Sequence, residues 1–204
     1  MPLEKAKMYL DDSKMVKIYD LSQPWGVDTP LWPFPGARTD LQFPRGQYLG
    51  RFHKRTMTYT GTLHAGTHMD APNHVLHEEE VDREANGYTL AEIHLERCII
   101  VDMRYLKDEF EAKWKAAEGD PAKMGDIWHI IMPDEFEAAC KKDGLEVREN
   151  DWVVINTGFH HYWRVNNDKY YNYYPGEGPE LANYLTEEKH IKGISGTWGA
   201  TDAP

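Results

Sequence analysis

Three histidines and one aspartate lie within eleven residues of this 204-residue chain, in the segment His64-Ala-Gly-Thr-His68-Met-Asp70-Ala-Pro-Asn-His74. Imidazole nitrogen and carboxylate oxygen suit zinc, manganese, iron or nickel ions. His64, His68 and Asp70 form a candidate three-ligand site with open positions for water or substrate, as is typical of catalytic metal sites. His74 is a candidate acid or base just outside the ligands, because imidazole titrates near neutral pH.

The segment 64–74 is predicted to be a strand end followed by a turn. His64 and His68 have the four-residue spacing of helical zinc proteases, but no glutamate lies between them, and Pro72 disfavours a helix. Gly66 permits backbone angles that other residues avoid. The alternatives are histidines that are only solvated or bonded to backbone, and a metal site that serves stability alone.

The elements around this segment predict an α/β fold with a mixed, partly parallel β-sheet core and flanking helices. Strand and helix patterns alternate from residue 98 to residue 198, an order that favours parallel pairing. The expected strands are 15–21, 56–63, 98–103, 151–159 and 191–198. The expected helices are 108–118, one that opens at 132–135 and stops at Gly144, and 180–190. Residues 89–96 are expected to form a connector, and the tyrosines of 170–174 a packed or interface loop.

Composition narrows the possible partners. The net charge of −11 repels nucleic-acid phosphates and anionic lipids, so we expect no nucleic-acid and no membrane partner. The two cysteines form no disulfide framework, and no signal peptide is recognisable. We therefore expect a cytoplasmic protein with a single domain over residues 1–204, acting on a small molecule. The Pro-rich arm of residues 23–50 suggests packing over a neighbouring subunit, hence a homodimer or homotetramer.

Two groups of side chains are candidates for substrate binding. Trp25, Trp32 and Phe34 lie in the Pro-rich arm, where they either line a pocket for a flat substrate or simply anchor the arm to the core. His160 and His161 follow a predicted strand, at the end where ligand-contacting loops tend to lie. Their alternative is two solvated loop histidines.

The histidine segment and its flanking elements resemble those of a known family. HAGTHMDAPNH at 64–74 matches the HxGTHxDxPxH signature of the metal-dependent cyclase-like hydrolases, the family of the bacterial kynurenine formamidase and isatin hydrolase type. YDLSQPWGVDTPLWPFPG resembles the opening strand and arm of that family, and DWVVINTGF and LANYLTEEKHIKGISGTWGATDAP resemble later elements. The resemblance implies a cyclase-like, swivelling β/α/β fold and one divalent ion, Mn²⁺ or Zn²⁺, on His64, His68 and Asp70, with His74 transferring protons. It also implies hydrolysis, through metal-activated water, of the C–N bond of a small amide, imide, formamide or lactam, with an aromatic substrate favoured.

Two features depart from the family pattern. The Thr-x-Ser-x-Asp element of the family reads Thr197-Trp198-Gly199-Ala200-Thr201-Asp202 here. The sequence also stops at Pro204, whereas members of the family usually continue with a His and a Glu that complete a second metal position. A truncated product, ligands from another chain, and a mononuclear or impaired site all stay open. The alternative function is a non-catalytic metal- or ligand-binding remnant of such an enzyme.

Overall fold

The structure of the protein is a computed structural model in which two compact units, Met1–Met69 and Asp70–Pro204, can be distinguished. The described residues are 7–11, 14–17, 20–26, 28–32, 39–42, 47–49, 52–54, 58–62, 64–71, 74 and 97–200. The predicted connector 89–96 and Phe34 lie outside the described residues.

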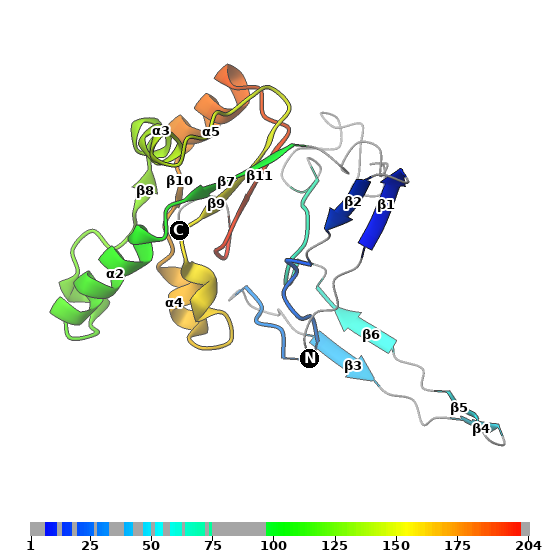
Figure 1. The fold of residues 1–204 in the computed structure, drawn as a ribbon. Coiled ribbons are helices and arrows are strands. Elements are labelled where there is room, and N and C mark those ends of the chain that lie inside the picture. Colours follow the sequence, from blue (N-terminus) through cyan, green and yellow to red (C-terminus); the bar gives the residue numbers. More distant parts are fainter. Residues whose placement is uncertain are drawn as a thin grey trace. The chain divides into compact units, whose positions relative to one another are not determined.

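The second unit is built on a three-stranded parallel sheet (Figure 1). Its strands, in the order β11-β9-β7, are β7 (Cys98–Asp102), β9 (Trp152–Asn156) and β11 (Gly193–Gly196). Ile99 lies beside Val153, which lies beside Ile194 on the next strand. The predicted strands 98–103, 151–159 and 191–198 and their parallel pairing are confirmed, and with them the mixed α/β fold class.

Helical crossovers connect these parallel strands, as parallel pairing requires. Between β7 and β9 come α2 (Tyr105–Ala116), a 3₁₀ turn (Pro121–Lys123), β8 (Ile130–Ile131) and α3 (Pro133–Lys142). Between β9 and β11 come a 3₁₀ turn (Phe159–Tyr162), α4 (Asn167–Asn172), β10 (Gly176–Glu177), α5 (Pro179–Asn183) and a π-helical turn (Tyr184–Glu188). The two-residue strands β8 and β10 pair in parallel, apart from the main sheet.

The helix ends follow local chemistry. α3 begins at Pro133, has Asp134 and Glu135 in its first turn, and is followed by Gly144 at φ +65°, as predicted. α2 begins three residues before the predicted position 108, because the carboxylate of Asp102 accepts the backbone N–H of Arg104 just before the first turn. α2 ends at Ala116, two residues before the predicted end at residue 118.

One face of the sheet carries the core. Ile99, Val101, Val153 and Ile155 are buried on that face, and α3 packs against β7. Ile100, which points to the opposite face, is 53% exposed. The prediction of a buried strand at 98–103 therefore holds for one face only, because helical crossovers cover that face and leave Ile100 open in the described part of the chain.

A buried lysine ties α4 to α2. Lys169 is only 7% exposed, and its Nζ lies 3.0 Å from Oε1 of Glu111, which also accepts a hydrogen bond from the hydroxyl of Tyr162. The same ammonium lies 4.7 Å from the centre of the Trp114 ring and 5.4 Å from that of Phe110. A carboxylate and aromatic faces together compensate for burial of the charge.

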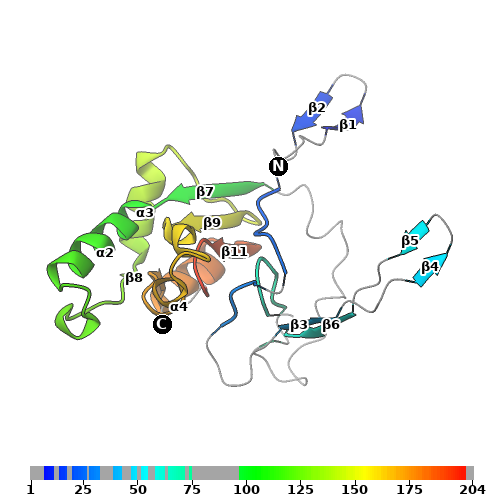
Figure 2. The ribbon, with the colours of Figure 1, turned by 90° about the horizontal axis from the view of Figure 1, so that it is seen from below.

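The first unit consists of antiparallel strand pairs (Figure 2). The pairs are β1 (Lys7–Asp11) with β2 (Lys14–Lys17), β3 (Thr39–Gln42) with β6 (Thr58–Gly61), and β4 (Gln47–Leu49) with β5 (Phe52–Lys54). β2 overlaps the expected strand 15–21, and β6 lies within the expected strand 56–63. Residues 20–26 and 28–32 are irregular except for a bridge at Leu31, as their prolines predict.

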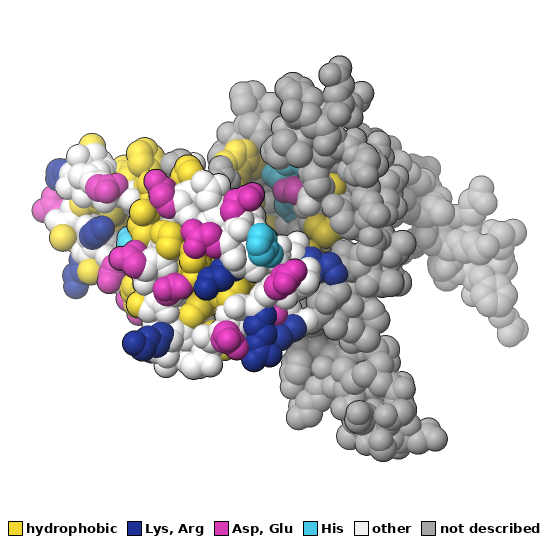
Figure 3. Space-filling view, turned by 90° about the horizontal axis from the view of Figure 1, so that it is seen from above, with side chains coloured by type: hydrophobic (Ala, Val, Ile, Leu, Met, Phe, Trp, Pro, Cys, Tyr) yellow, Lys and Arg dark blue, Asp and Glu magenta, His cyan; other side chains and the backbone are white. Residues whose placement is uncertain are grey.

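The surface of the described part mixes acidic and basic side chains over the face seen in Figure 3. Among the described helices, none is long and apolar enough to cross a membrane.

Candidate metal centre

The Pro-rich arm lies directly on the first part of the histidine segment. The backbone N–H of Gln23 donates to Oγ1 of Thr67 at 3.0 Å, and Leu31 forms an antiparallel bridge with Ala65. A Cβ atom at Gly66 would lie 3.1 Å from Cδ1 of Trp25. These contacts hold the arm against residues 65–67, next to both His64 and His68.

Glycine at position 66 allows that approach. Gly66 has φ +69°, in the left-handed region that side-chain-bearing residues rarely adopt. The prediction of an unusual backbone conformation at this glycine is confirmed. The segment 64–71 contains no helix, so the predicted strand end and turn also agrees with the structure.

Two alanines within the motif are buried, while its polar side chains are not. Ala65 and Ala71 are buried, whereas His64 is half-buried and His68, Asp70 and His74 are exposed. The backbone N–H of His74 donates to the carbonyl of Ala71 at 2.8 Å. The potential ligands therefore remain reachable from solvent.

The first two histidines form a pair with a defined tautomer. Nε2 of His68 lies 2.9 Å from Nδ1 of His64, and Nδ1 of His68 lies 2.8 Å from the carbonyl oxygen of Gly66. A carbonyl oxygen only accepts hydrogen bonds, so Nδ1 of His68 must carry the proton. In neutral His68 the unprotonated nitrogen is then Nε2, which faces His64. A backbone carbonyl that orients the second nitrogen in this way is common for metal-ligating histidines.

A second set of contacts joins the same segment. His64, Asp70 and His74 each offer a ligand atom, and these three atoms all lie within 4.8 Å of one another. Two ligand atoms of one zinc ion, each about 2.1 Å from it, are at most about 4.2 Å apart. Small rotations of these side chains, of which Asp70 and His74 are exposed, would bring the set to a common ion, and imidazole with carboxylate is a suitable donor set for manganese or zinc. The residues therefore fit a divalent ion.

His64 belongs to both groupings. The sequence predicts His64, His68 and Asp70 as ligands and His74 just outside them. The structure places His68 against His64, and places Asp70 and His74 near His64. All four predicted residues are thus gathered in one stretch of chain, while their division into ligands and proton-transfer group stays a prediction.

The predicted substrate-binding residues lie in both units. Trp25 is 46% exposed beside Gly66, and Trp32 is half-buried. In the second unit, His160 and His161 form the 3₁₀ turn after β9, with ring centres 4.2 Å apart. Burial, followed by the neighbouring charges of His161 and Arg104, lowers the pKa of His160.

The carboxyl ends of β9 and β11 carry a polar network that joins two segments of the family resemblance, DWVVINTGF and the altered element that begins at Thr197. Thr157, which is fully buried, donates its backbone N–H to Oγ1 of Thr197 at 3.1 Å, and Oδ1 of Asn156 accepts the N–H of Gly158 at 3.1 Å. The sequence feature that indicates such a network is a set of polar residues directly after an apolar strand, where ligand sites of parallel sheets are found. The network fixes the turn that presents His160 and His161.

Comparisons with known proteins agree with this architecture. A family model described as a putative cyclase matches residues 19–203. Isatin hydrolase A from Labrenzia aggregata, bound to benzyl benzoate, has a TM-score of 0.65 and 21% identity, covering 91% of this chain and 69% of that chain. An isatin hydrolase bound to the product analogue thioisatinate has a TM-score of 0.68 and 20% identity, covering 91% of this chain and 68% of that chain.

A third structure, isatin hydrolase A from Ralstonia solanacearum, has a TM-score of 0.67 and 17% identity, covering 91% of this chain and 68% of that chain. A search of curated protein sequences gave no match. Identities at this level establish the likeness of fold, and the family model extends over nearly the whole sequence. The chain therefore belongs to the cyclase family.

Proposed function

We propose that this chain is a metal-dependent hydrolase that cleaves the C–N bond of a small amide, imide, formamide or lactam. The observation that carries the proposal is the His64–His68 pair, with its 2.9 Å separation and the Gly66 carbonyl behind His68. Two imidazole nitrogens at this distance are held together either by a hydrogen bond, here from Nδ1–H of His64 to Nε2 of His68, or by a cation that both nitrogens bind. The proximity of Asp70 and His74 to His64 supports the cation.

The proposed roles divide the segment 64–74. His64, His68 and Asp70 hold one divalent ion, Mn²⁺ or Zn²⁺. When bound, such an ion polarises a substrate carbonyl and lowers the pKa of water. His74 takes a proton from the attacking water and returns it to the leaving nitrogen of the substrate.

An aromatic substrate is the favoured class. The indole of Trp25 is partly exposed and packs on Gly66, beside the paired histidines. A flat ring can stack on such a side chain. Two of the similar structures are isatin hydrolases bound to thioisatinate or benzyl benzoate, both of which contain aromatic rings. We propose that Trp25 and Trp32 contact the ring of the substrate.

The setting and assembly are part of the same proposal. Cys98 and Cys140 are free thiols, as a reducing cytoplasm maintains. We propose a cytoplasmic homodimer or homotetramer whose partner is a small-molecule substrate.

The test is metal content per chain, measured on protein purified without chelator, together with hydrolysis of isatin and of an aromatic formamide. We expect about one equivalent of manganese or zinc in the parent, as a three-ligand site would hold. Asp70→Ala should lose both metal and turnover. His74→Ala should keep the metal and lose turnover, because it removes only the proton-transfer group.

A matched histidine variant serves as control. His190 is exposed, lies outside the motif and has φ +53°, a conformation that asparagine tolerates. His190→Asn should retain both metal and turnover. Metal in the parent without hydrolysis of either class of substrate would instead favour the non-catalytic binding protein, and a parent without metal would refute the proposed centre.

A further inference from the structure

The second unit has a solvent-accessible hollow of about 380 Å³ beside the carboxyl end of β7. Its charged side chains and its histidine are Asp102, Arg104, Lys107, Asp108, Lys142 and His161, and Tyr105 completes the lining. Asp102 is the last residue of β7, and His161 follows the neighbouring parallel strand β9. Ligands of open parallel sheets commonly bind outside the carboxyl ends of the strands.

Both carboxylates of the hollow are already paired. Asp102 accepts hydrogen bonds from Nε of Arg104 at 2.8 Å and from its Nη2 at 2.6 Å, and the Arg104 side chain lowers the pKa of Asp102 to about 2. Asp108 accepts from Nζ of Lys107 at 2.8 Å. The bidentate contact also fixes the plane of the Arg104 guanidinium, which stays 60% exposed.

Positive charge is left over at the rim. Lys142 lies in the last turn of α3 and is exposed, and no carboxylate of the described residues lies within salt-bridge distance of it. Among the lining residues, three cationic side chains thus stand beside two carboxylates, with His161 as an additional hydrogen-bonding group. Asp143, which follows Lys142 in the chain, is a further carboxylate that acts on Arg104 from outside the lining. On a chain with a net charge of −11, an excess of positive charge within the lining itself favours an anion at this place.

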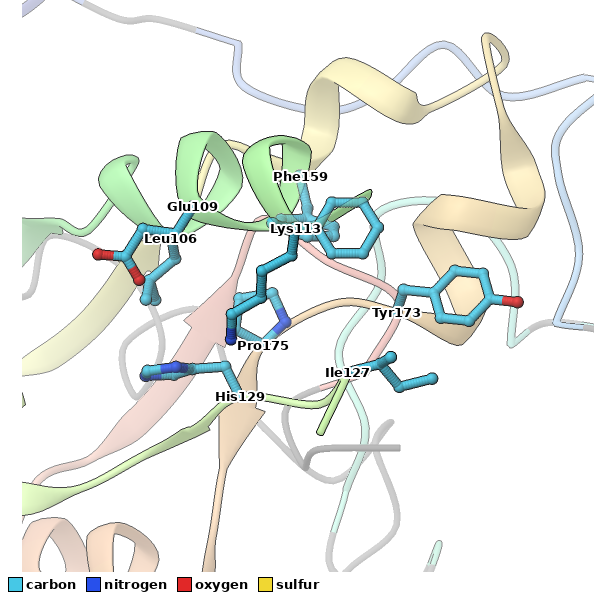
Figure 4. A pocket seen from close by; sticks show the side chains of 9 residues that line it. Leu106, Glu109, Lys113, Ile127, His129, Phe159, Tyr173 and Pro175 are labelled. Atoms are coloured by element: carbon cyan, nitrogen blue, oxygen red, sulfur yellow. The ribbon is translucent and has the colours of Figure 1, made fainter. Parts of the chain in front are cut away.

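Size distinguishes this hollow from a crevice nearby. The crevice in Figure 4 is lined mostly by apolar side chains, among them Leu106, Phe110 and Phe159, with His129 at one end. Its volume of about 20 Å³ suffices for a single water molecule. The hollow at β7 is large enough for a small organic molecule or a hydrated oxyanion, since ligand sites usually measure about 300–1,000 Å³.

We propose that the hollow at the carboxyl end of β7 binds a small oxyanion, the carboxylate or phosphate group of a small molecule. The Arg104 guanidinium and the Lys142 ammonium donate to its oxygens, and His161 contacts it from the turn after β9. This site requires neither a metal ion nor hydrolysis, so it stands apart from the proposed function.

The experiment is calorimetric titration of the full chain with two probes, inorganic phosphate and benzoate, at constant ionic strength. Constant ionic strength is needed because salt alone screens exposed charges. We expect saturable binding of at least one probe to one site per chain. Lys142→Gln should weaken that binding about five- to tenfold, since it removes one charge-assisted contact.

A neighbouring lysine provides the matched control. Lys141 lies in the same last turn of α3 and is exposed, but it does not line the hollow. Lys141→Gln should change the dissociation constant less than about twofold, as screened surface charges do. His161→Gln, which touches the hollow from another element, should weaken binding as well.

The two probes distinguish the sources of the oxyanion. Binding of phosphate alone assigns the site to phosphate groups, binding of benzoate alone assigns it to carboxylates, and competition between the two assigns it to both. The proposal is overturned if neither probe binds saturably, or if Lys141→Gln and Lys142→Gln weaken binding equally.

Discussion

The segment 64–74 and the sheet region 97–200 differ in what their side chains do. In the sheet region, large apolar residues such as Val153, Phe136 and Leu181 are fully buried. Among the described residues of the segment 64–74, the buried side chains are alanines, and the groups capable of chemistry are exposed or half-buried. The proposed metal centre thus lies on a stretch that contributes little apolar burial.

This contrast separates the free energy of unfolding from the free energy of metal binding. Burial of large apolar side chains provides most of the stability of a domain, at about 25 cal/mol per Å². The described contacts of the histidine segment with the Pro-rich arm are instead the Gln23–Thr67 hydrogen bond, the Leu31–Ala65 bridge and the packing of Trp25 on Gly66. Variants in the two regions should therefore affect metal binding and unfolding separately.

The largest effect is expected for His68→Ala. It removes the nitrogen that lies 2.9 Å from His64, so we expect loss of bound metal and a fall in turnover of about 10⁴-fold, equivalent to several kcal/mol of transition-state stabilisation. The free energy of unfolding in chelator should change by less than about 0.5 kcal/mol, because the side chain is exposed. A large loss of stability of the metal-free protein in urea unfolding would contradict the idea that metal binding and folding depend on different regions.

The opposite result is expected for Phe136→Ala. Phe136 on α3 is 0% exposed, and truncation of a buried phenylalanine typically costs about 3–5 kcal/mol of unfolding free energy. The remaining folded protein should still bind metal. Val165→Ala, at a position that is 80% exposed, is the control and should change stability by less than about 0.5 kcal/mol. Loss of metal from folded Phe136→Ala protein would show that the two regions are energetically coupled.

The same contrast explains how far sequence patterns predicted the fold. Apolar runs at 98–103 and 151–159 located β7 and β9, and Pro133 located the start of α3. α4 was missed because its tyrosines suggested a packed loop, although Tyr170 and Tyr171 are helical and buried. The signal was Asn166, whose side chain caps the helix by accepting the N–H of Lys169.

For the candidate site, residue types and spacing predicted which groups gather but not how they pair. The motif predicts a site formed by His64, His68, Asp70 and His74. The structure pairs His68 with His64 and brings ligand atoms of His64, Asp70 and His74 within 4.8 Å of one another. The role of the Gly66 carbonyl in fixing the tautomer of His68 depends on backbone direction, which no residue pattern states. The hollow lined by Arg104 and Lys142 depends on the start of α2 lying near the end of α3, which is a tertiary property.

A smaller effect is expected where the arm meets the motif. Gly66→Ala places a Cβ atom at φ +69° and 3.1 Å from Trp25, so we expect a loss of about 1–2 kcal/mol in unfolding free energy. Metal affinity should fall about 10- to 100-fold, because relief of the strain would move the backbone carbonyl of residue 66, which orients His68.

Gly125→Ala is the matched control for the backbone strain. Gly125 has φ +68°, but no atom lies within 4 Å of the position of its Cβ. This variant should lose similar stability from strain alone and keep its metal affinity. An equal loss of metal affinity in the two variants would show that Gly66 has no specific role in the proposed centre.

The smallest effect concerns pH in the sheet region. Nε2 of His129 lies 2.8 Å from Oε2 of Glu135, and this hydrogen bond raises the pKa of His129 above its usual value of 6.5, although partial burial opposes the shift. Burial also raises the pKa of Glu135, but hydrogen bonds from His129 and Tyr105 outweigh it and lower that pKa below 4.5.

A raised pKa in the folded state means that protonated His129 stabilises the fold fully below the unfolded value near 6.5. This contribution is lost as the pH rises through the folded pKa. Since both side chains are partly exposed, we expect only a few tenths of a kcal/mol to about 1 kcal/mol. Urea unfolding at pH 6 and pH 8.5 should show a larger loss of stability at high pH for the parent than for His129→Gln. An identical pH response in the two proteins would mean that the His129–Glu135 pair adds no charge-dependent stability to the sheet region.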